Sequence, residues 1–177
     1  MLDLIIKNGS CYIDKDLKDQ DIAIKDGKII KIGKIDSEAK ETFDAEGLTV
    51  LPGCIDTQTH FREPGSTDTE DLHSGSRAAI VGGITSVFEM PNTNPPTSTK
   101  VEFQKKLDLA KNRMYCNYAF YFGATADNAN ELADLVNLEG CCGIKLFAGS
   151  STGNLLVAEE EDIEKVFQSS SKVVAVH

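Results

Sequence analysis

From Leu48 onward the sequence alternates between short apolar runs and longer amphipathic segments, and this alternation constrains the fold more than any other feature. It predicts an α/β fold, because strands that alternate with helices form a parallel sheet through right-handed crossover connections. The predicted strands lie near residues 49–56, 84–89, 115–121, 142–147 and 172–176. The predicted helices lie near residues 68–82, 99–112, 126–137 and 158–168.

Two of these helices begin with the sequence of a capping box, Thr67 with Glu70 and Thr99 with Glu102. In a capping box the hydroxyl and the carboxylate bind backbone N–H groups that have no partner within the helix. We therefore expect the first two helices to start at these threonines.

The residues before this alternation read as short β-rich runs separated by turns. The clearest are Asp21–Lys25 and Lys28–Ile32, which are joined by Asp26-Gly27. An Asp-Gly pair between alternating runs is typical of a hairpin, because both residues tolerate the positive φ of a type I′ turn. The sequence thus predicts a small β-sandwich-like module at residues 1–50 and an α/β domain at residues 51–177.

Composition limits the classes of partner. The 177 residues carry 18 Lys and Arg against 28 Asp and Glu, a net charge of −10. Without a basic stripe the chain is not expected to bind nucleic acid or an anionic membrane surface. Neither a long apolar stretch nor a signal-peptide pattern is present, and the five cysteines lack paired spacing, so we expect a cytoplasmic protein with reduced thiols. A small molecule is the expected ligand.

Candidate functional residues follow three of the predicted strands, where parallel α/β folds place their sites. Gln58 and His60 lie two residues apart, so they share a face if the strand continues. An imidazole is a natural zinc ligand, and the guanidinium of Arg62 suits a carboxylate. Asn92 belongs to a rigid loop, Phe88–Pro96, whose amides can orient a ligand.

The other two candidates are Lys145, within the apolar run of the fourth strand, and His177, at the end of the fifth. A buried lysine is unfavourable unless it is paired or modified. Each candidate also has a purely structural interpretation: satisfied histidines, a lysine whose ammonium reaches solvent, and an ordinary Asn-Pro turn. We interpret His73, on the first helix, as a surface residue.

Four motifs together resemble dihydroorotase, of the cyclic amidohydrolase group. They are Asp-x-x-x-His-Phe-Arg-Glu-Pro-Gly at 56–65, Gly-Gly-Ile-Thr-Ser-Val at 82–87, Met-Pro-Asn-Thr-Asn-Pro-Pro at 90–96 and Gly-Ile-Lys-Leu-Phe-x-Gly-Ser-Ser-Thr-Gly-Asn at 143–154. The combination of the first and third favours dihydroorotase over hydantoinases and allantoinases. The resemblance implies a metal-dependent (β/α) TIM-type barrel that interconverts dihydroorotate and N-carbamoyl-aspartate in pyrimidine biosynthesis.

The same resemblance implies roles for individual residues. His60 would bind a metal, carboxylated Lys145 would bridge two zinc ions, and His177 would bind the second ion. Arg62 and Asn92 would hold the substrate carboxylate. Paired cations would lower the pKa of a bridging water and stabilise the tetrahedral oxyanion.

The sequence departs from the family pattern in two ways. Gln58 stands where the family has the first histidine of His-x-His, and an amide oxygen is a poorer zinc ligand than imidazole. The family's later strands, with a further histidine and the aspartate base, have no counterpart here. We therefore expect a truncated barrel of four βα units and a fifth strand, inactive by itself.

Two other hypotheses remain open. The chain could be one subunit of a split or self-complemented hydrolase, or a non-catalytic module that binds an active homologue. Both would use the exposed barrel edge, because an unpaired strand edge invites association.

Overall fold

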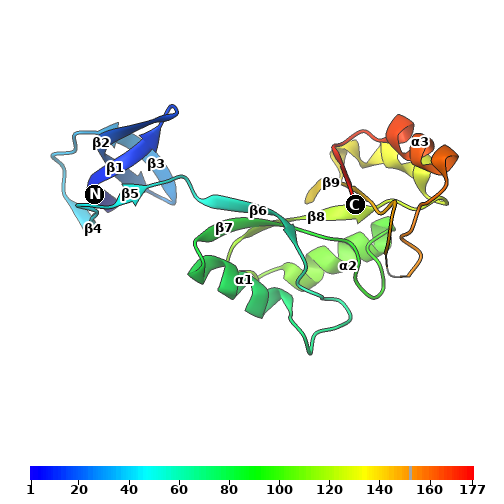
Figure 1. Ribbon diagram of the computed structural model, residues 1–177. Coiled ribbons are helices and arrows are strands. Elements are labelled where there is room, and N and C mark those ends of the chain that lie inside the picture. Colours follow the sequence, from blue (N-terminus) through cyan, green and yellow to red (C-terminus); the bar gives the residue numbers. More distant parts are fainter. Residues whose placement is uncertain (152) are drawn as a thin grey trace. The chain divides into compact units, whose positions relative to one another are not determined.

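The computed structural model describes residues 1–151 and 153–177, which divide into two units, Met1–Pro52 and Gly53–His177 (Figure 1). Thr152, within the last of the four motifs, lies outside the described residues. In the described part of the chain, none of the helices combines the length and the apolar character needed to span a membrane. Each unit is built around its own sheet.

The N-terminal unit contains one five-stranded sheet. Its strands are β1 (Leu2–Ile13), β2 (Asp16–Lys25), β3 (Lys28–Gly33), β4 (Ala39–Asp44) and β5 (Thr49–Val50). The order is β3-β2-β1-β4, and β5 also pairs with β1. β1 is antiparallel to β2 and parallel to both β4 and β5.

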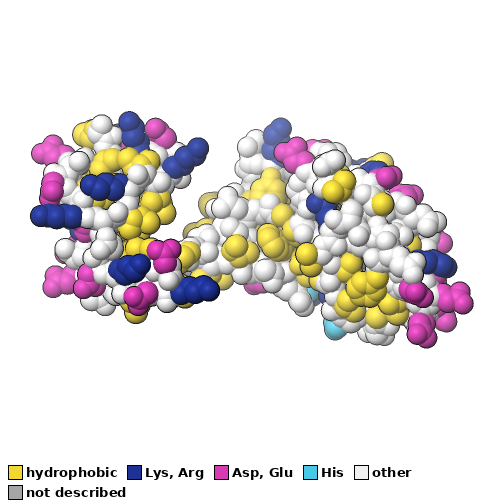
Figure 2. Space-filling model, turned by 90° about the horizontal axis from the view of Figure 1, so that it is seen from above, with side chains coloured by type: hydrophobic (Ala, Val, Ile, Leu, Met, Phe, Trp, Pro, Cys, Tyr) yellow, Lys and Arg dark blue, Asp and Glu magenta, His cyan; other side chains and the backbone are white. Residues whose placement is uncertain are grey.

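The hairpin prediction for this unit is confirmed. β2 and β3 pair antiparallel, and Asp26 and Gly27 both have positive φ, 52° and 70°. These values are the ones a type I′ turn requires. Ile5, Ala23 and Ile35 form the small core, while Ile30 of β3 is exposed. Figure 2 shows hydrophobic side chains gathered on the surface of this unit.

The C-terminal unit contains a parallel sheet in the order β10-β9-β8-β7-β6. The strands are β6 (Cys54–Thr59), β7 (Ile84–Glu89), β8 (Asn117–Gly123), β9 (Cys141–Leu146) and β10 (Val174–Val176). The connections carry α1 (Leu72–Val81), α2 (Lys100–Ala110), the 3₁₀ helix η1 (Ala129–Asn137) and α3 (Glu160–Ser169). Strands in sequential order with helical crossovers are the arrangement of part of a TIM-type barrel. Figure 1 shows α1 and α2 along one face of β6, β7 and β8.

The core of this unit lies between the sheet and its helices. Phe103 of α2 packs against Phe120 and Phe122 of β8, with ring centroids 6.3 and 6.2 Å apart. Leu132 of η1 and Val166 of α3 extend the same buried cluster. This packing holds the strands in place and so determines where the loops at their carboxyl ends lie.

The predicted start of the first helix is wrong. α1 starts at Leu72 rather than near 68, and its capping box is formed by Asp71 and Ser74 instead of Thr67 and Glu70. The amide of Thr69 donates to the Ser66 carbonyl, which places these residues in a turn. Thr99 does cap α2, because its hydroxyl accepts the amide of Glu102, but the Glu102 carboxylate accepts Lys105 Nζ and only the threonine half of the expected capping box is seen.

The segment predicted as a helix near 126–137 is the 3₁₀ helix η1. Its amides bond three residues back, as from Glu131 to the Asn128 carbonyl. The side chain of Asn128 does not cap η1, because it binds Thr125, Ser98 and Gly123 instead. Because the Asn128 side chain binds the neighbouring loop, η1 starts without the side-chain cap that usually stabilises the start of a helix.

Candidate functional site

The candidate site lies in the loops that follow β6 and β7. His60 comes directly after β6, and its Nδ1 is 3.0 Å from Oδ1 of Asn92, in the loop after β7. The two loops are also joined through their backbones. The Met90 amide donates to the Thr59 carbonyl, and the Asn94 amide donates to the Pro64 carbonyl, each over 2.9 Å. The sheet therefore brings together two motifs that are thirty residues apart in the chain.

A pocket of about 330 Å³ opens between these loops. Arg62 contributes an exposed guanidinium, and its backbone has φ 61°, in the left-handed region. Asn92 and Asn94 contribute amides to the same pocket. A cation beside amide groups is suited to a small anionic ligand. Of the predicted site residues, Arg62, Asn92 and His60 are thus brought together.

The pKa of the His60 imidazole is lowered, mainly because the ring is half-buried. The hydrogen bond to Asn92 opposes this shift, while the positive charges of Arg62, Lys145 and Lys106 add to it. A histidine with a lowered pKa is neutral at pH 7. With Nδ1 facing Asn92, the lone pair for an electrophile or a cation would come from Nε2.

Lys145, on β9, is only 2% exposed. Burial lowers its pKa. Throughout residues 1–151 and 153–177, no hydrogen bond or ion pair of its ammonium group is found, and Nζ lies 5.1 Å from the ring centre of Phe147. Burial without a counter-ion disfavours the charged ammonium, and this is the kind of lysine whose pKa shifts and whose amine takes part in chemistry.

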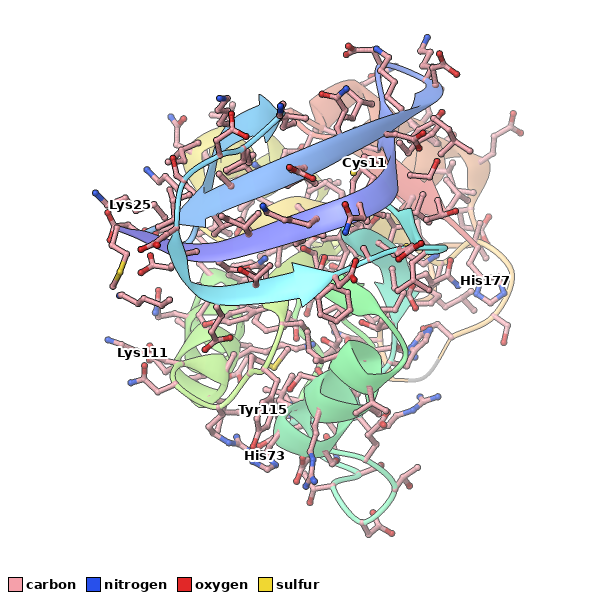
Figure 3. The ribbon with its side chains drawn as sticks, turned by 90° about the vertical axis from the view of Figure 1, so that its left-hand side faces the viewer. Cys11, Lys25, His73, Lys111, Tyr115 and His177 are labelled. Carbon is pink, nitrogen blue, oxygen red and sulfur yellow. The ribbon has the colours of Figure 1, made fainter. Side chains whose placement is uncertain are left out.

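His177 lies just after β10 and is exposed (Figure 3). Its ring centre is 6.1 Å from that of Phe147. Its backbone carbonyl accepts the amides of Ala148 and Gly149, over 2.8 and 3.2 Å. Phe147 therefore lies beside both Lys145 and His177, the two predicted residues that come from the far end of the sheet.

The predicted ligands do not form a complete metal site among the described residues. No group of three His, Cys, Asp or Glu side chains there is close enough to hold an ion. Gln58 is exposed, and its backbone amide donates to the side chain of Asp56. His60, Lys145 and His177 supply too few donors for a closed site.

Sequence reasoning missed Glu63, which anchors the loop after β6. Its buried carboxylate accepts two hydrogen bonds from the guanidinium of Arg113, over 2.8 and 3.1 Å, and one from the Leu72 amide. The bond to Glu63 raises the pKa of Arg113. A bidentate pair fixes both planes, so Glu63 holds the loop against the ends of α1 and α2.

A second missed pair lies beneath the loops. Glu89 ends β7 and Lys106 lies on α2, and the two side chains form an ion pair at 1% and 0% exposure. Burial raises the pKa of Glu89 to about 7 and lowers that of Lys106. The signal was a single carboxylate at the end of the otherwise uncharged strand Ile84–Glu89. Its partner follows in the helix after the strand.

His73 lies outside the site. Its ring is exposed on α1, where Nε2 is 3.3 Å from the hydroxyl of Tyr115 (Figure 3). The two rings meet edge to face at 5.1 Å. The interpretation of His73 as a surface residue is consistent with this position.

Comparison with known proteins identifies the family. The sequence model of the amidohydrolase family matches residues 49–175. The chain belongs to the amidohydrolase family. Among solved structures of amidohydrolases, an L-hydantoinase (dihydropyrimidinase) from Arthrobacter aurescens superposes with a TM-score of 0.91 at 31% identity, over 100% of this chain and 41% of that one. The expected barrel-type fold is thereby confirmed.

Curated relatives carry two kinds of name. A dihydroorotase from Methanosarcina mazei is 38% identical over 99% of this chain and 39% of its own length. An allantoinase from Escherichia coli O1:K1 / APEC is 40% identical over 84% of this chain and 33% of its own length. The chain therefore spans well under half the length of the relatives it matches. Amidohydrolase membership does not by itself choose between their substrates.

Proposed function

We propose that these 177 residues carry the carboxylate-binding part of a dihydroorotase-type cyclic amide hydrolase of pyrimidine biosynthesis, and that they do not turn over dihydroorotate by themselves. The observation that carries the proposal is the pocket between the loops after β6 and β7, where Arg62 and Asn92 lie beside His60. The resemblance to dihydroorotase implies that Arg62 and Asn92 bind the substrate carboxylate.

The charge of the pocket favours dihydroorotate over allantoin. Dihydroorotate and N-carbamoyl-aspartate each carry a carboxylate, whereas allantoin is a neutral ring. The exposed guanidinium of Arg62 can form a bidentate pair only with the former two. Asn92, held by His60, is placed to donate through its amide nitrogen, because its oxygen faces the imidazole.

Zinc belongs to the proposal as what the family resemblance implies. His60 and His177 would be ligands, and Lys145, buried without a counter-ion, is suited to react with carbon dioxide. Gln58 replaces a stronger ligand, and the described residues do not complete a metal site. We therefore assign no catalytic step to these residues alone, and the proposal is one of binding.

Arg62→Met should weaken binding of N-carbamoyl-aspartate and of dihydroorotate by about ten- to a hundredfold, because a charge-assisted hydrogen bond is lost. Isothermal titration calorimetry of the 177-residue chain measures this. Arg77→Met is the matched control, since Arg77 is exposed on α1 and lines a different pocket. Equal affinity of Arg62→Met and the parent, or allantoin binding as tightly as dihydroorotate, would argue against the carboxylate site.

Gln58→His should produce no ring opening of dihydroorotate, with or without added zinc. The new imidazole adds one ligand, but the described residues contain no group of three His, Cys, Asp or Glu side chains that could already hold an ion. An ultraviolet absorbance assay for loss of the dihydroorotate ring measures turnover, with the parent chain as the reference. Zinc-dependent turnover by either chain would refute the proposed inactivity.

A second candidate function is that of one subunit of a split or self-complemented hydrolase. It is favoured by the sheet order, in which β6 and β10 each have one neighbouring strand. This candidate expects zinc-dependent ring opening when a chain that supplies the remaining ligands is added. The absence of turnover with such a chain would leave the binding proposal as the better account.

A further inference from the structure

The ion pair of Glu89 and Lys106 touches both loops of the candidate site through their backbones. Oε1 of Glu89 accepts the amide of Phe61, over 3.3 Å, in the loop after β6. Nζ of Lys106 donates to the carbonyl of Met90, over 2.9 Å, in the loop after β7. Phe61 is the residue after His60, and Met90 lies two residues before Asn92.

We propose that Glu89 and Lys106 are positioning residues, which hold the loop after β6 against the loop after β7 and thereby set the distance between His60 and Asn92. The inference rests on the proposed function only in treating these loops as the ligand-binding loops. Nothing in the motifs that resemble the family points to Lys106, which lies outside all four.

The polar chemistry of the pair suits a positioning role better than the role of merely filling space in the core. The Phe61 amide is a donor and the Met90 carbonyl is an acceptor, and both are buried away from water. A buried backbone group without a partner is destabilising, so each needs a polar side chain of opposite kind. The carboxylate of Glu89 accepts the Phe61 amide, and the ammonium of Lys106 donates to the Met90 carbonyl. Each side chain also neutralises the charge of the other.

The surroundings of the pair make it rigid. Nζ of Lys106 also lies 4.9 Å from the ring centre of Phe120, in the core of the unit. Lys106 is anchored on α2 and Glu89 on β7, so the loops are fixed to two elements of regular structure. A site on loops is more accurately placed when its supporting contacts come from such elements.

The test is the double variant Glu89→Met/Lys106→Met, which removes both charges together and leaves neither one buried alone. We expect its unfolding midpoint in urea to fall less than that of a variant that loses one charge, because only the Phe61 amide and the Met90 carbonyl are left without partners. The Asn94 amide should exchange its hydrogen at least about tenfold faster in the double variant than in the parent. This amide bonds to the Pro64 carbonyl across the loops and does not touch the pair.

Affinity for N-carbamoyl-aspartate is the second measurement, and it should fall about tenfold or more in the double variant. Val166→Ala is the matched control, because Val166 is buried on α3 and belongs to the core away from these loops. It should lower the midpoint yet change neither Asn94 exchange nor affinity. If the parent chain does not bind the ligand, the proposed function fails while Asn94 exchange still decides this inference.

Unchanged Asn94 exchange in a folded double variant would overturn the positioning role. If the double variant does not fold, Glu89→Asp replaces it. This substitution keeps the charge but withdraws the carboxylate by one methylene from Lys106 and the Phe61 amide. Faster Asn94 exchange in Glu89→Asp supports the role, and parent-like exchange contradicts it.

Discussion

Lys106→Met should lower the free energy of unfolding by about 3–5 kcal/mol, because it leaves the carboxylate of Glu89 buried and unpaired. Both side chains are almost fully buried, so water cannot replace the lost partner. The Met90 carbonyl loses its hydrogen bond as well. Urea denaturation of the 177-residue chain, followed by circular dichroism, measures the change.

The size of this loss should depend on pH. Burial raises the pKa of Glu89 from 4.5 to about 7 even with Lys106 present, and removal of the positive charge raises it further. Between the unfolded and folded pKa values the folded state binds more protons, so stability falls as pH rises through this window. This decline in stability ends near pH 7 in the parent, where Glu89 has lost its proton, and continues to higher pH in the Lys106→Met variant. The deficit of Lys106→Met therefore grows as pH rises.

Lys105→Met is the matched control for this prediction. Lys105 is the preceding residue on α2, but it is exposed and pairs with Glu102 at the surface. Exposed ion pairs contribute little, so this variant should unfold almost as the parent does at every pH. A loss of stability in Lys106→Met that is small, or equal on both sides of pH 7, would contradict the account of a buried, titrating carboxylate.

Gly65→Ala should cost about 2–4 kcal/mol, from backbone strain and overpacking together. Gly65 has φ 121°, which residues with a side chain rarely adopt. A β-carbon there would lie 2.9 Å from Cβ of Asn94 and 3.0 Å from its backbone nitrogen. The clash is with backbone, which cannot turn away as a side-chain tip can. The same substitution should disturb the pocket, since Asn94 lines it.

Gly83→Ala separates the two contributions. Gly83 also has positive φ, 86°, but an added β-carbon would meet nothing within 4 Å. It should therefore show only the conformational cost, about 1–2 kcal/mol. Thermal unfolding of both variants beside the parent gives the comparison. Equal losses for the two glycines would mean that contact with Asn94 contributes nothing.

Much of the fold follows from local patterns in the sequence. The strand Ile84–Glu89 and the turn at Asp26-Gly27 are where periodicity and turn chemistry place them, because both depend on neighbouring residues. The start of α1 does not follow from local patterns. Thr67 and Glu70 have the right spacing for a cap, but Glu63 accepts the Leu72 amide from outside the helix. That contact depends on how the loop folds back, which no short window of sequence contains.

In the candidate site, too, some residues can be found from local patterns in the sequence and others cannot. His60, Arg62 and Asn92 stand out because polar groups after apolar strands are unusual and the strands are parallel, so their ends meet. Glu63 and Arg113 are fifty residues apart, and their pairing depends on the packing of two helices. Motif reasoning finds the polar groups in the loops that follow the strands. It does not find the charges beneath them.

The ion pair beneath the loops has a consequence for how the sequence can diverge. Loss of either Glu89 or Lys106 alone leaves a charge stranded in the core, whereas loss of both leaves only two backbone groups in need of new partners. Single substitutions at these positions should therefore be selected against, and paired replacements tolerated. Among amidohydrolases that share this arrangement, positions 89 and 106 are expected to change together, even though sixteen residues lie between them in the chain.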